Sequence, residues 1–97
     1  MTEFTQLSDA EKIAETFGIV LGAASQHRGT DDERINSITT KVKDIVSATA
    51  ADEIEAEVAE ERFFAAMEAG RAAAENGRID PQATESALDE LEAKITF

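Results

Sequence analysis

Cysteine, tryptophan and tyrosine are absent from this 97-residue chain, and histidine occurs once. Without cysteine the fold uses neither disulfides nor thiolate ligands, which excludes structural zinc of the cysteine-rich kind and fits a reducing compartment. A Ser-His-Asp arrangement could use only His27, which lies where the carboxyl end of a helix favours a cation. The G-x-S-x-G, phosphate-loop and dinucleotide motifs are also missing. The sequence therefore predicts a protein that is not an enzyme and has no catalytic residues.

Metal and cofactor motifs are equally scarce. Di-metal helical bundles use Glu-x-x-His pairs, but Ala24 stands three residues before His27. The stretch 30–33 lacks the spacing of a calcium loop. We expect no cofactor and no metal site. A carboxylate metal-binding bundle is a distant alternative, because Glu53, Glu57 and Glu60 or Glu61 share a helical face.

Long hydrophobic runs are missing too. The longest, residues 17–24, has eight residues, whereas a membrane-spanning helix needs about 20. The first residues, Met1 to Phe4, lack the basic and apolar regions of a signal peptide. These features predict a cytoplasmic protein with no membrane partner.

Basic residues are few. Nine Lys and Arg stand against 21 Asp and Glu, which gives a net charge of -12. Such a charge disfavours direct contact with nucleic acid or with anionic lipid surfaces. The natural complement is another protein with a basic surface.

The periodic segments are all helical. After a lead-in over residues 1–7, expected to be extended or frayed, Ser8 and Glu11 form a capping box that starts a first helix, and Gly29 ends it. Gly18 and Gly22 lie four residues apart within this helix. Glycine weakens a helix, so we expect another helix to approach its backbone closely here.

A second helix follows a second predicted capping box at Thr30 to Glu33. Its apolar stripe is regular and comprises Ile35, Ile38, Val42, Ile45 and Val46. Near residues 47–50 the pattern weakens. Either a turn ends the helix and Thr49 caps the next one, or the two helices continue through a kink; the pattern favours a break.

A long helix is predicted at about 50–76, with an acidic first half and an apolar second half. In the first half, Ile54 and Val58 are expected to point inward. Asp80 and Pro81 then start a final helix, with Asp80 as the cap. The fold class is therefore all-α: a small helical bundle of about four helices in one domain, 1–97, with one long central helix.

The acids are concentrated on this long helix. Residues 49–77 have a net charge of -6, half of the total. Glutamates four residues apart destabilise their own helix by a few tenths of a kcal/mol per pair, so the acids serve either a partner or solubility. The candidate partner-binding acidic face comprises Asp52, Glu53, Glu55, Glu57, Glu60 and Glu61.

Carboxylates one helical turn apart are separated by about 5 to 6 Å, which is close to the spacing of neighbouring phosphates. A Lys- and Arg-lined groove that holds DNA or RNA would attract such a surface. The sequence therefore suggests a protein-binding inhibitor that occupies the basic surface of a nucleic-acid-binding partner. As a class of mechanism this resembles the nucleic-acid mimics and the small phage-encoded inhibitors of the anti-CRISPR type, although no motif assigns the chain to a family.

The alternative is a structural or assembly subunit that acts through an apolar helix face, with acids that only keep it soluble. Alanine supplies 18 of the 41 apolar residues, so large core side chains are few, and a homodimer would add burial. The candidate apolar interface comprises Phe63, Phe64, Met67 and Gly70.

Overall fold

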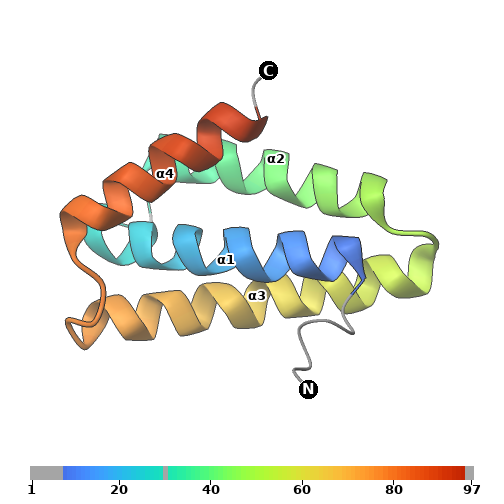
Figure 1. Cartoon of the computed structure of the whole chain (residues 1–97), viewed down its shortest axis with the longest axis horizontal. Coiled ribbons are helices and arrows are strands. Elements are labelled where there is room, and N and C mark those ends of the chain that lie inside the picture. The colour runs from blue at the N-terminus through green and yellow to red at the C-terminus, as the bar shows by residue number, and fades with distance from the viewer. Residues whose placement is uncertain (1–7, 30, 96–97) are drawn as a thin grey trace.

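Four helices form the bundle in the computed structural model, which describes residues 8–29 and 31–95 (Figure 1). They are α1 (Asp9–Arg28), α2 (Glu33–Thr49), α3 (Glu53–Glu75) and α4 (Pro81–Ile95). The predicted all-α bundle is confirmed, and the predicted long helix is α3, with 23 residues. Within this bundle α1 contacts all three other helices. Figure 1 shows α3 along one side of α1, with α2 and α4 on the other. The predicted lead-in, residues 1–7, lies outside the described residues.

The closest packing joins α1 and α3. A Cβ built on Gly22 would overlap the backbone of Met67, and a Cβ built on Gly70 would overlap the carbonyl oxygen of Ile19. At Gly18 the nearest atoms, Ala66 Cβ and the Phe63 carbonyl oxygen, would lie 2.8 Å away. Only glycine allows the two backbones to come this close, so the close approach expected at Gly18 and Gly22 is confirmed.

The start of α1 is the predicted capping box. The Glu11 amide donates to Ser8 Oγ, and the Ser8 amide donates to Glu11 Oε1, each at 3.2 Å. The first four amides of a helix, counted from the cap residue, have no partner inside the helix, and this reciprocal pair satisfies two of them. Helix α4 starts as predicted, since the Ala83 amide donates to Asp80 Oδ2 at 3.1 Å.

The cap predicted for α2 was misplaced. Asp32, rather than Thr30, has the extended backbone of a cap, and its carboxylate accepts a hydrogen bond from the Ile35 amide at 3.0 Å. Thr30 itself lies outside the described residues. This N–H donor holds the pKa of Asp32 below its ordinary value, and Arg28 lowers the pKa further. Three acids in a row make the register of a cap ambiguous from sequence.

The break favoured between the second and third helices is confirmed, but Thr49 does not cap α3. Thr49 is the last residue of α2, and Ala50 leaves the helix in an extended conformation. Asp52 then caps α3 by accepting from the Glu55 amide at 2.8 Å. A carboxylate is at least as good a cap as a threonine hydroxyl. Because Asp52 rather than Thr49 is the cap, α3 starts three residues later than predicted.

The core is formed mainly by the predicted stripes. In α2, Ile35, Ile38, Val42 and Val46 are buried, and in α4, Leu88 and Leu91 are buried. Phe63 of α3 and Leu21 of α1 are the largest buried side chains. Nine of the buried core side chains come from α1 and α3 together, and seven of these are alanines (Ala10, Ala14, Ala23, Ala24, Ala59, Ala66 and Ala74). Small side chains allow these helices to lie close together.

Over residues 8–29 and 31–95, none of the helices has the length and apolar character that crossing a membrane requires.

Replacing Gly22 by Ala is expected to lower the free energy of unfolding by about 1 to 3 kcal/mol. The new methyl group meets the backbone of α3, which cannot rotate away as a side chain can. The higher helix propensity of Ala offsets at most about 1 kcal/mol of this loss. Urea unfolding followed by far-ultraviolet circular dichroism measures the change.

Gly18→Ala is a milder version of the same change, because the atoms nearest to a Cβ at Gly18 are farther away than those at Gly22. It should lower the free energy of unfolding by less than Gly22→Ala does. Ala69→Ser, at an exposed position of α3, is the control for adding one atom. If Gly22→Ala unfolds at the same or a higher urea concentration than the wild type, the close contact does not limit stability.

Candidate functional site

Two of the six predicted acidic-face residues hold the start of α3. Asp52 is the cap, and the carboxylate of Glu55 accepts a hydrogen bond from the Ala51 amide at 3.0 Å. These two carboxylates therefore accept hydrogen bonds from backbone amides at the start of α3. They lie at the end of the acidic face, where they stabilise the helix.

The other four acids, Glu53, Glu57, Glu60 and Glu61, are exposed on α3. We define them as the α3 acidic surface. Within the described part of the chain, none of the four makes a hydrogen bond or an ion pair. Their charges therefore face solvent.

The base nearest in sequence is turned away from this surface. Arg62 lies 3.4 Å from Glu11 and 3.5 Å from Glu15, measured between its guanidinium nitrogens and the carboxylate oxygens of α1. It thus links α3 to α1. The pKa of Glu11 lies below its ordinary value, mainly because the Ser8 amide donates to its carboxylate, and Arg62 lowers it further.

Two more arginines neutralise acids of α4. Arg34 in α2 contacts Asp89 and Glu92, each at 2.6 Å, and Arg28 at the end of α1 contacts Glu85 at 2.8 Å. These carboxylates raise the pKa of both guanidinium groups. The ion pairs join α4 to α1 and α2. Three of the four acids of α4, Glu85, Asp89 and Glu92, therefore have basic partners, whereas the α3 acidic surface has none among the described residues.

Most of the predicted apolar interface packs inside the chain. Phe63 is 1% exposed, Gly70 is buried against α1, and Met67 packs at the edge of the core. Only Phe64 is open, at 50% exposure, with the Lys43 ammonium 5.3 Å from the centre of its ring. A second copy therefore has Phe64, but neither Phe63 nor Gly70, available for contact.

The expectation that Ile54 and Val58 point inward is wrong. They are 74% and 44% exposed, on the side of α3 that faces away from α1. The physical reason is helical phase: Phe63 packs against α1, and nine residues earlier, at 100° per residue, Ile54 lies half a turn away. The spacing of Ala59, Phe63, Ala66 and Gly70 contained this signal, since it marks the buried face. The candidate contact residues that sequence reasoning missed are therefore these exposed apolar side chains.

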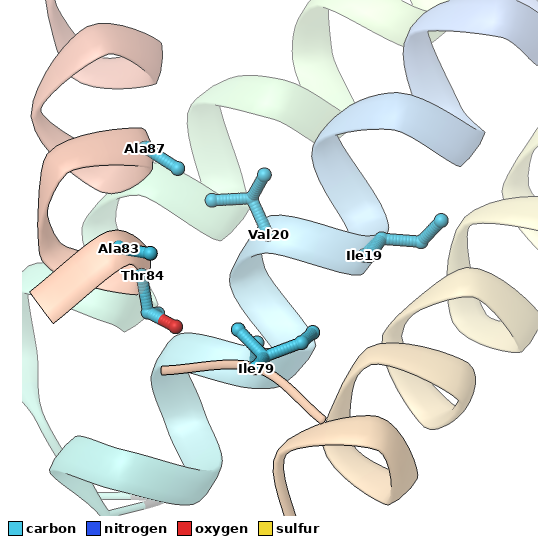
Figure 2. A pocket seen from close by; sticks show the side chains of 7 residues that line it. Ile19, Val20, Ile79, Ala83, Thr84 and Ala87 are labelled. Carbon is cyan, nitrogen blue, oxygen red and sulfur yellow. The ribbon is translucent and has the colours of Figure 1, made fainter. Parts of the chain in front are cut away.

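A small apolar pocket lies between α1 and α4, beside the link that follows α3 (Figure 2). Its volume is about 240 Å³, and its walls include Ile19, Val20, Ile79 and Ala87. The Thr84 hydroxyl donates to the Asp80 carbonyl at 3.0 Å, so it offers no free donor to a guest. The pocket is smaller than the usual range for small-molecule sites, which begins at about 300 Å³.

The single histidine has no acid or nucleophile partner in the described residues. His27 is half-buried in the last turn of α1, and its Nε2 is buried without a hydrogen-bond partner there. Over the same residues, no three His, Asp or Glu side chains are grouped closely enough to hold a metal ion. The arrangement offers surfaces for contact with another molecule.

Glu11→Gln is expected to destabilise the fold by about 1 kcal/mol at pH 7, because it removes a charged capping acceptor and a partner of Arg62. The pKa of Glu11 is lower in the folded chain than the ordinary value of 4.5. Its contribution is therefore complete above that ordinary value and is lost as the pH falls through the folded pKa. The difference between the unfolding curves of wild type and variant should be smaller at pH 3 than at pH 7.

Glu57→Gln is the matched control, because Glu57 is exposed and pairs with no described residue. It should not destabilise the fold at pH 7, since removing one of several like charges lowers repulsion. A Glu11→Gln deficit of the same size at both pH values would contradict the role assigned to this carboxylate.

Comparison with protein-family models, with curated proteins and with solved structures gave no match. The function must therefore be argued from the surfaces of the chain itself.

Proposed function

We propose that this chain is a non-enzymatic protein-binding module whose α3 acidic surface occupies a basic surface of another protein. In its sharper form, the partner uses that basic surface to hold nucleic acid, and the chain is an inhibitor that competes with the nucleic acid. Neither nucleic acid nor a membrane is a direct partner, because a net charge of -12 repels both.

The observation that carries the proposal is that the α3 acidic surface has no ion-pair partner in the part of the chain that the structure describes. Arg28, Arg34 and Arg62 pair with acids of other helices, so basic groups are placed where they join helices. Glu53, Glu57, Glu60 and Glu61 pair with none of the described basic residues. Such a surface stabilises a complex with a cationic partner more than it stabilises the chain's own fold.

The geometry suits a basic groove. Helix α3 places Glu53, Glu57 and Glu61 one turn apart, about 5 to 6 Å along the axis. Lys and Arg side chains that contact successive phosphates could contact these carboxylates in turn. The net charge of the whole chain would also accelerate the encounter at low ionic strength.

A second candidate function is an assembly subunit that binds through apolar side chains while its acids provide solubility. The observation in its favour is that Ile54, Val58 and Phe64 are all exposed on the same helix. In this case the apolar side chains would form the interface of a homodimer or a contact with a neutral protein. It would depend little on salt.

The test compares proteins captured from a lysate of the source cells by immobilised wild type and by the triple variant Glu53→Gln, Glu57→Gln, Glu60→Gln. We expect nucleic-acid-binding proteins on the wild type, released by added salt and by duplex DNA. The variant should bind them at least about tenfold more weakly, because several charge pairs are lost. Quantitative mass spectrometry reads both outcomes.

The matched control is the triple variant Glu33→Gln, Asp44→Asn, Glu90→Gln. It removes the same number of negative charges, but from exposed positions outside α3. It should capture the same proteins as the wild type. Unchanged capture by the α3 variant would refute the acidic-surface proposal. Loss on Phe64→Ala, with salt-resistant capture by the α3 variant, would favour the assembly subunit.

A further inference from the structure

The side of α3 that faces away from α1 carries a line of apolar side chains. Ile54, Val58, Ala65, Ala69 and Ala72 are all exposed, at spacings of four, seven, four and three residues. These spacings place them on one face of the helix, which we call the outer face. Ile54 is 74% exposed and is the most exposed large apolar side chain in the described residues. Nothing in the described chain covers this face.

An acidic edge runs along one side of the outer face. It consists of Glu57, Glu61, Glu68 and Glu75, all exposed, at spacings of four, seven and seven residues. Glu68 has an ion pair with Arg71 at 3.2 Å. The other three have no ion-pair partner among residues 8–29 and 31–95. A seven-residue repeat beside an apolar line is the pattern by which one helix recognises another through salt bridges.

The charge of this edge selects the occupant. Anionic lipid head groups and nucleic acid phosphates would be repelled. A second copy fits poorly, because antiparallel pairing through the outer face sets one acidic edge against the other. In either orientation it joins two chains that each have a net charge of -12. A partner with apolar side chains flanked by Lys or Arg can cover the outer face and also pair with the acidic edge.

We propose that the outer face of α3 binds a basic amphipathic helix of the partner protein. This inference rests on the proposed function and names the structural element that the partner presents. The apolar side chains of that helix pack on Ile54 and Val58, and its Lys or Arg side chains contact the acidic edge. The alanines further along α3 allow the partner helix to lie close. From Ile54 to Ala72 the face is about 27 Å long, which corresponds to about five helical turns.

The probe is a labelled 21-residue peptide of three heptads, with Leu at the apolar positions and Lys, Gln and Ala elsewhere. A second peptide has the same composition in an order that leaves no apolar stripe. Fluorescence anisotropy with the full chain gives both dissociation constants. We expect the heptad peptide to bind at least about tenfold more tightly, because only it buries Ile54 and Val58 as a helix.

Ile54→Ser should reduce this preference about fivefold or more. Ile19→Ser is the matched control, since Ile19 is the same residue type, also exposed, on α1; it should leave the preference unchanged. Circular dichroism confirms that both variants keep the wild-type helix content. Light scattering of wild type and Ile54→Ser should give the same mass.

Equal affinity of the two peptides would overturn the helix proposal while leaving the acidic-surface proposal intact, because charge alone would then explain binding. Absence of binding by both peptides, or an equal effect of the two Ile variants, would also overturn it. A lower mass for Ile54→Ser would assign the face to a second copy instead. The lysate experiment with the α3 acid variant tests the proposed function independently of these outcomes.

Discussion

The structure depends on the close contact between the backbones of α1 and α3. Gly22 meets the backbone of Met67, and Gly70 meets that of Ile19. With no room for a Cβ at either position, the two helices can pack closely only through these sides. That contact decides which face of α3 is buried, and so which face remains open. The exposure of Ile54 and Val58 on α3 is thus a consequence of glycines placed elsewhere in the chain.

The arginine side chains form ion pairs between the packed helices. Arg62 extends from α3 to two glutamates of α1, and Arg28 and Arg34 hold α4 through its carboxylates. In a chain with nine basic residues and 21 acidic ones, this leaves the α3 acidic surface without an ion-pair partner among residues 8–29 and 31–95. Surface ion pairs contribute little individually. Here they matter more because they leave the α3 acidic surface unpaired in the described part of the chain, and its acids are the basis of the proposed contact with a basic partner.

An acidic surface and an apolar line on one helix reinforce each other. Carboxylates alone would attract many cationic molecules with little selectivity, and apolar side chains alone would favour self-association. Together, along about five turns of α3, they favour a partner that presents both kinds of group in register. The same acids that weaken α3 as an isolated helix discourage pairing between two copies. These features are the basis of the proposed recognition role.

The sequence by itself determined the four helices, the capping box at Ser8 and Glu11, the start of α4 at Asp80, the close approach at Gly18 and Gly22, and the concentration of acids on α3. These follow from local rules, because periodicity, caps and glycine act within a few residues. Only the tertiary structure decided that Phe63 and Gly70 pack inside, that Arg62 turns to α1, and that Ile54 and Val58 face solvent. Helix α3 is apolar on more than one side in its second half, so its pattern allows several rotations about its axis. The contact with α1 selects one of them, and the partners of that contact lie more than forty residues apart in the chain.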